Sequence, residues 1–213
     1  MFGTQDLTLF IVSGLLLNIA PGPDSLLIMA RSASQGFRAG SAAALGVGSG
    51  TLVHVLAAAL GLSALMAASS WAFGLVKLLG AAYLVYIGLS LLLHRAAAEG
   101  PREAAATLPP KQSLRSIYLQ GLLTNVLNPK VALFFLAFVP QFIAADAPSK
   151  PLAFVFLGLV FNLNGMLWCH FLAWSTAQAS RRITASPRVV SWLNRAIGAV
   201  FLGFGLRLAL AQR

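Results

Sequence analysis

Two charged residues, one acidic and one basic, each follow a proline inside a long apolar stretch. The two segments are Asn18-Ile-Ala-Pro-Gly-Pro-Asp24 and Asn125-Val-Leu-Asn-Pro-Lys130. A charge near the middle of a membrane-spanning helix costs roughly 2.5–3.5 kcal/mol, so such residues usually serve function. Broken helices at corresponding positions of two halves point to a transporter's binding site. We expect Asp24 to meet an amine or a proton and Lys130 to meet a carboxylate, which suits a small zwitterion.

The prolines predict where the backbone breaks. Proline lacks an amide donor and clashes with the preceding turn, so carbonyls are left unpaired at membrane depth. Such breaks are tolerated where they line a cavity or are buried in protein. The break residues are therefore candidates for the substrate or proton pathway, together with the neighbouring asparagines: Asn18, Pro21, Gly22, Pro23, Asn125, Asn128 and Pro129.

Simpler interpretations of the same residues remain open. Asp24 could cap the half-helix that follows Pro23, as aspartate often does. Lys130 could extend toward a membrane interface. The asparagines Asn18, Asn125 and Asn128 could link helices by hydrogen bonds without touching a substrate.

Further polar residues lie within other apolar stretches. Thr51 and His54 are three apart and so share a helix face, and Asn162 lies in the fifth stretch. Histidine side chains ordinarily titrate near neutrality, which makes His54 a candidate proton carrier, although a structurally satisfied histidine fits equally well. Small residues four apart, such as Gly46 and Gly50, are typical of close helix packing.

Composition limits the class of protein. Hydrophobic residues make up 58% of the chain, charged residues 9%, and the mean hydropathy is +0.82. Soluble domains carry about 25% charged residues, so the chain is predicted to be an integral membrane protein. The net charge of +10 comes from residues in short connections, which argues against nucleic-acid binding. Cys169 is the single cysteine, so a relay of electrons through paired thiols is excluded. We expect no enzyme activity, no cofactor and no metal site.

Six stretches are long enough to cross a hydrocarbon layer about 30 Å thick. They cover residues 6–35, 39–66, 71–93, 113–142, 150–178 and 190–211, and the first and fourth are the broken ones. The predicted fold is all-α, a single membrane domain over 1–213. Residues 94–112 form a cytoplasmic linker between repeat 1 (6–93) and repeat 2 (113–211). Lys77–Tyr86 also matches Arg195–Phe204 in its basic, glycine and aromatic positions, and three spans per half predict an inverted repeat.

Orientation follows from the lysines and arginines. Most of them lie in the first, third and fifth connections, which the positive-inside rule places in the cytoplasm. Both termini are therefore predicted to lie outside. The N-terminus has no basic region before its first apolar stretch, so that stretch is expected to be a retained span and not a cleaved signal peptide.

Six motifs follow one another along the chain: Pro21-Gly-Pro-Asp24, Gly36-Phe-Arg-Ala-Gly40, Gly46 to His54, Gly80-Ala-Ala-Tyr-Leu84, Asn128-Pro-Lys130 with Phe134-Phe135, and Pro140-Gln141-Phe142. Together they resemble the LysE/RhtB family of bacterial amino-acid exporters, and the resemblance runs from about residue 10 to residue 210. The resemblance implies a multi-pass inner-membrane exporter of amino acids or close derivatives, driven by proton antiport. It also implies that the motif residues Pro21 to Asp24 and Asn128 to Lys130 are functional. A homodimer is left open by the small residues on the helices.

One competing prediction is an exporter of metal or other inorganic ions on the same architecture. The spans lack the cluster of carboxylates or thiolates that such a function needs, which favours the amino-acid exporter.

Overall fold

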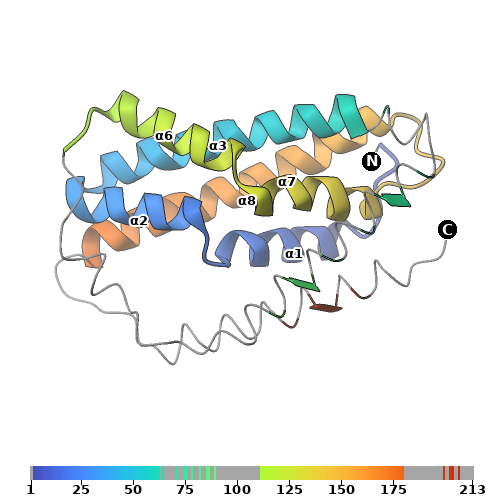
Figure 1. The fold of residues 1–213 in the computed structure, drawn as a ribbon, viewed down its shortest axis with the longest axis horizontal. Coiled ribbons are helices and arrows are strands. Elements are labelled where there is room, and N and C mark those ends of the chain that lie inside the picture. The colour runs from blue at the N-terminus through green and yellow to red at the C-terminus, as the bar shows by residue number, and fades with distance from the viewer. Residues whose placement is uncertain are drawn as a thin grey trace.

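The computed structural model describes residues 2–62 and 111–179, together with isolated residues elsewhere in the chain. Most of the described residues are helical, and one short bridge joins Thr4 to Ile143. In chain order the elements are α1 (Leu7–Ile19), α2 (Pro23–Gln35), α3 (Phe37–Ala57), η1 (Ala58–Leu62), α6 (Leu114–Val126), α7 (Pro129–Leu133), η2 (Phe134–Phe138), η3 (Val139–Phe142) and α8 (Lys150–Ala179). Figure 1 shows them as one elongated bundle.

Two of the spans are continuous and two are bent, as the sequence predicts. Residues Phe37–Leu62 and Lys150–Ala179 are long and apolar enough to cross a membrane, while α1 with α2 bends by 56° and α6 with Pro129–Phe142 bends by 46°. The prediction of an all-helical, polytopic membrane protein with broken first and fourth spans is confirmed. The predicted spans 71–93 and 190–211, and most of the linker 94–112, lie outside the described residues.

The chain returns on itself between α2 and α3 through a single residue. Gly36 has φ of +82°, a left-handed conformation that glycine adopts without strain, and its amide donates to the Ser32 carbonyl at 2.9 Å. The two helices therefore lie antiparallel. At the same end of the bundle, the Gln35 side chain pairs with the Gln112 backbone, donating at 2.9 Å and accepting at 2.8 Å. This pairing holds the start of α6 beside the end of α2.

Glycines let α3 and α6 approach each other closely. A Cβ on Gly46 would overlap the Tyr118 carbonyl, and a Cβ on Gly121 would overlap the Ala43 carbonyl. A Cβ on Gly50 would lie 2.8 Å from the Asn125 Cβ. The predicted role of Gly46 and Gly50 in helix packing is confirmed. Close backbone approach is the usual source of helix association in membranes, where water drives no burial between helices.

Buried apolar side chains form two clusters along the bundle. One contains Phe10, Leu17 and the aromatic residues of η2 and η3, packed against the first half of α8. The other contains Ile28, the alanines of α3, Ile117 and Cys169. Phe134 lies at the centre of the aromatic group, with ring centroids 4.6 Å from Phe161 and 5.0 Å from Phe138. The polar residues predicted to be functional lie where the two clusters meet.

Candidate functional site

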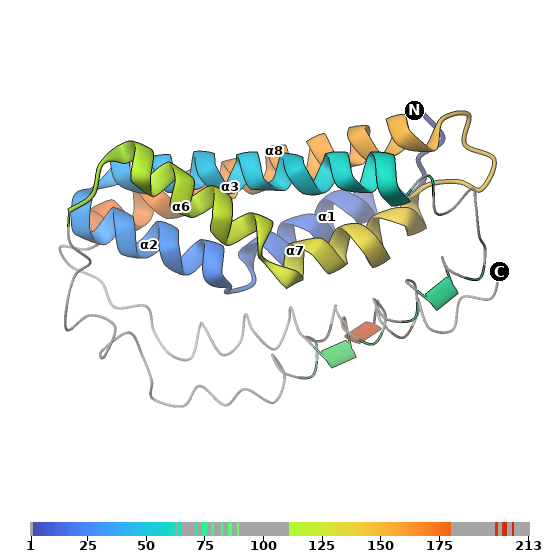
Figure 2. The same ribbon diagram turned by 45° about the horizontal axis from the view of Figure 1, so that its top comes forward.

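The two helix breaks lie side by side. Both views of the ribbon place the turn between α1 and α2 next to the turn between α6 and α7 (Figures 1 and 2). Both turns contain proline at or before the first residue of the following half-helix. Segments about a hundred residues apart in the sequence therefore form one site. A charged residue at each break hydrogen-bonds to groups at the other break.

Lys130 satisfies the carbonyls that the first break exposes. In a continuous helix the Leu17 carbonyl would accept from the amide of residue 21, but that residue is Pro21 and has no N–H. The Lys130 Nζ donates to the Leu17 carbonyl at 3.2 Å and to the Ala20 carbonyl at 3.0 Å. The expectation that Lys130 reaches toward a membrane interface is wrong, because its ammonium bonds within the bundle.

Asp24 makes the reciprocal contact with the second break. Its Oδ2 accepts from Asn125 Nδ2 at 2.9 Å and from Asn128 Nδ2 at 3.0 Å. The residue capping α2 is Gly22, so the alternative interpretation of Asp24 as a helix cap is wrong. Among the described residues, the hydrogen bonds of Asp24 and Lys130 go to these groups and not to each other. Each charge binds the opposite break, an arrangement we name the crossed fastening.

His54 and Asn128 complete the second break. Pro129 leaves the Asn125 carbonyl without its helical donor, and that carbonyl instead lies 3.0 Å from His54 Nε2 and accepts the Asn128 amide at 2.9 Å. Since the partner is a carbonyl, His54 Nε2 carries the hydrogen in this contact. The Asn128 Oδ1 accepts the Lys130 amide at 3.0 Å and caps α7. His54 therefore donates to the Asn125 carbonyl, as Lys130 donates to the Leu17 carbonyl.

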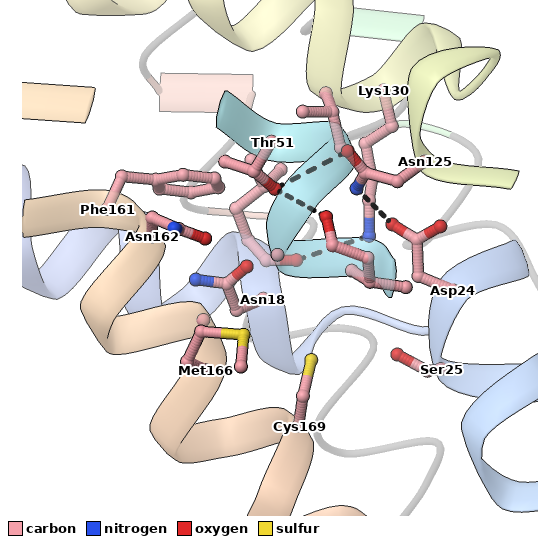
Figure 3. A pocket seen from close by; sticks show the side chains of 15 residues that line it. Asn18, Asp24, Ser25, Thr51, Asn125, Lys130, Phe161, Asn162, Met166 and Cys169 are labelled. Atoms are coloured by element: carbon pink, nitrogen blue, oxygen red, sulfur yellow. Dashed lines mark hydrogen bonds between the residues drawn. The ribbon is translucent and has the colours of Figure 1, made fainter. Parts of the chain in front are cut away.

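A cavity lies beside the crossed fastening, lined by residues of α1, α2, α3, α6, α7 and α8 (Figure 3). Its free space is about 30 Å³, enough for one or two water molecules and too small for an amino acid. The cavity in this structure is therefore too narrow to hold the substrate of an amino-acid carrier. Its lining residues are Leu17, Asn18, Asp24, Ser25, Val47, Gly48, Thr51, Asn125, Lys130, Val131, Phe161, Asn162, Gly165, Met166 and Cys169.

Half of the sequence-predicted site residues lie on the wall of this cavity. They are Asn18, Asp24, Thr51, Asn125, Lys130 and Asn162. Thr51 Oγ1 donates to the Val47 carbonyl at 3.2 Å and lies 3.4 Å from Asn125 Oδ1. His54 and Asn128 contact wall residues from outside the cavity. The remaining residues, Pro21, Gly22, Pro23 and Pro129, form the breaks without lining the cavity.

Sequence reasoning selected Asn162 on α8 but missed the residues of α8 that line the cavity beside it. Phe161, Met166 and Cys169 line the cavity together with Asn162 (Figure 3). Residues 162, 166 and 169 are spaced by four and three, so they share one helix face. An asparagine in an apolar helix marks the helix face that meets a polar cavity, and the residues at this spacing share that face. This is the signal that could have identified the α8 wall of the cavity.

The described residues include no group of three His, Cys, Asp or Glu side chains that could hold a metal ion. Within this part of the chain, Lys130 and Asp24 supply one positive and one negative charge at the cavity wall. The wall is therefore electrically balanced, with asparagine amides and apolar side chains around the two charges.

Comparison with known proteins points to one family. A family model described as LysE type translocator matches residues 15–212. An uncharacterized membrane protein of Pseudomonas aeruginosa is 32% identical over 98% of this chain and 97% of its own length. A leucine efflux protein of Salmonella typhimurium is 29% identical over 99% of this chain and 98% of its own length. No solved structure matches the chain significantly.

Proposed function

The chain belongs to the LysE type translocator family, and from this premise we propose that it exports amino acids or close derivatives across the bacterial inner membrane. Family membership makes it a multi-pass membrane transporter and not an enzyme. Similarity to leucine efflux proteins along nearly the whole chain supports an amino acid as the transported molecule.

The observation that carries the proposal is the crossed fastening beside a small polar cavity. Two broken helices meet at the point where Asp24 and Lys130 each bind the other's break. Non-helical backbone at membrane depth is tolerated where it lines a cavity, and transporters place their substrate sites there. The balanced charge of the wall suits a zwitterion, which brings no net charge into a region of low dielectric constant.

The fastening also suggests how the cavity widens to admit a substrate. Asp24 holds α2 to Asn125 of α6 and to Asn128 at the start of α7 through hydrogen bonds from the two side-chain amides, and bonds to a charged acceptor are about twice as strong as neutral ones. A proton on the Asp24 carboxyl would weaken both bonds and release the two breaks from each other. We infer that proton entry and substrate movement are coupled at this residue, as export by proton antiport requires.

The reciprocal fastening supports the predicted inverted repeat, with repeat 1 at 6–93 and repeat 2 at 113–211. In that arrangement Asp24 and Lys130 occupy equivalent positions of opposite orientation. The distribution of lysines and arginines supports a cytoplasmic linker at 94–112 and both termini outside. A homodimer remains an additional proposal, open to measurement by cross-linking in the membrane.

Efflux from loaded cells tests the proposed function. Cells expressing the protein are loaded with a panel of labelled amino acids that includes leucine and lysine, and release is measured with and without a proton gradient. We expect faster release of at least one amino acid, dependent on the gradient and abolished by Asp24→Asn and by Lys130→Met. The matched controls are Asp146→Asn, at an exposed aspartate, and Lys150→Met, at the first residue of α8. Full export by both site variants would contradict the proposed mechanism.

A further inference from the structure

The polar groups on the cavity wall divide into those that bind the protein and those that do not. Asp24, Asn125, Lys130 and Thr51 all hydrogen-bond to groups of the opposite helices or of their own backbone. Two of the three ammonium hydrogens of Lys130 go to carbonyls. Lys130 and the Oδ2 of Asp24 are therefore already occupied in holding the two breaks together, whereas the Oδ1 of Asp24 is buried without a hydrogen-bond partner in the described part of the chain.

Asn18 and Asn162 are different. The Asn18 Nδ2 is buried and has no hydrogen-bond partner among the described residues. The Asn162 side chain likewise makes no hydrogen bond within the described part of the chain, although it lines the same cavity. Figure 3 shows both amides on the side of the cavity next to Met166, opposite Asp24 and Asn125. A buried amide nitrogen without a partner, as at Asn18, is rare and needs a specific reason.

Two glycines, Gly165 and Gly48, lie beside these two amides. A Cβ on Gly165 would lie 3.3 Å from both Asn18 Nδ2 and Asn18 Oδ1. A Cβ on Gly48 would overlap the Met166 sulfur and lie 3.4 Å from Asn162 Oδ1. Glycine at these two positions therefore leaves space at the amides that any other residue would fill.

We propose that Asn18 and Asn162 form the subsite that binds the ammonium and carboxylate of the transported amino acid. Each amide offers an oxygen that accepts from an ammonium and an NH₂ group that donates to a carboxylate. Two such groups can hold a zwitterion without adding net charge. Phe161, Met166 and Cys169 lie beside them on α8 and would contact an apolar side chain. In this assignment Lys130 is a positioning residue, and the carboxylate does not depend on it.

This assignment rests on the proposed function and deepens it. Interhelical hydrogen bonding, the simpler interpretation of Asn18, requires a protein partner, and its amide nitrogen has none among the described residues. Asn164 on α8 also has a buried amide nitrogen without a partner in this part of the chain, but it does not line the cavity. Asn164 is therefore the matched control: the same residue type, the same helix and the same lack of a partner.

The test uses the purified full chain in proteoliposomes, with labelled leucine as the first probe and the amino-acid panel as the second. Asn18→Leu, Asn162→Leu and Asn164→Leu are compared with the unmodified protein for the KM of export and for the melting temperature without ligand. We expect KM to rise at least about tenfold in the first two variants, since each loses a hydrogen bond to a charged group. We expect KM to stay unchanged in Asn164→Leu. Asn18→Ala and Asn162→Ala replace any leucine variant that does not fold.

The melting temperature separates binding from structure. Removing an amide that bonds nothing leaves the ligand-free melting temperature equal or higher, whereas removing a helix link lowers it. An unchanged KM in both cavity variants, or a melting temperature lowered by more than about 5 °C, overturns the subsite. Absence of export of every panel member by the unmodified protein instead overturns the proposed function, so the two failures are distinguishable.

Discussion

Replacing Lys130 with methionine should destabilise the protein strongly, because two backbone carbonyls lose their partner. The Leu17 and Ala20 carbonyls accept from Lys130 Nζ at 3.2 and 3.0 Å, and Pro21 supplies no amide to the first of them. Each carbonyl left unpaired in a buried site costs about 1–3 kcal/mol. Removing a buried charge returns part of this, so we expect a net loss of about 3 kcal/mol.

The assay is thermal unfolding of the purified protein in detergent. For a chain of this length 1 kcal/mol corresponds to about 2–4 °C, so Lys130→Met should lower the melting temperature by about 6–12 °C. Lys150→Met is the control and should change it by less than about 2 °C, since a lysine at the first residue of α8 has no such role.

A second variant tests the stated cause. Pro21→Ala restores an amide that can donate to the Leu17 carbonyl, so adding it to Lys130→Met should recover part of the loss. A melting temperature for Lys130→Met within about 2 °C of the unmodified protein would refute the reasoning, because the carbonyls would then have other partners.

Three further predictions follow from the packing. Gly46→Ala forces α3 away from the Tyr118 carbonyl and should cost about 1–3 kcal/mol, whereas Gly61→Ala, where a Cβ meets no atom within 4 Å, should be neutral in the same melting assay. His54→Gln keeps a donor for the Asn125 carbonyl and should retain export, whereas His54→Ala should not; loss of export in both variants would instead favour a proton carrier. Phe134→Ala should cost about 3–5 kcal/mol, because its ring contacts Phe138 and Phe161; a shift below about 2 °C would contradict this.

The spans and breaks were predictable because their causes are local. A stretch of apolar residues sets the length of a span, and Pro21, Pro23 and Pro129 mark the breaks wherever the helices pack. The expected first span at 6–35 is observed as Leu7–Ile19 and Pro23–Gln35. The π-helical segments η1 and η2 were not predictable, because apolar residues there fit an α-helix equally well.

Many residues of the site were predictable from the sequence, but the hydrogen bonds that join them were not. Sequence reasoning selected Asp24 and Lys130 by their charge, and both line the cavity. It could not find their partners, because Lys130 binds backbone carbonyls, which every residue has. Likewise, the cavity face of α8 depends on how that helix is rotated in the bundle, and its sequence carries only a faint signal in Asn162, Met166 and Cys169.

The most direct test of the crossed fastening is the labelling rate of Cys169. It is the single cysteine of the chain and lines the cavity, so no cysteine needs to be introduced. The rate with a small methanethiosulfonate reagent is measured in the unmodified protein and in Asp24→Asn, with Cys169→Ser as the blank. The fastening predicts slow labelling of the buried Cys169 in the unmodified protein and clearly faster labelling in Asp24→Asn. Equal rates in the two proteins would contradict it.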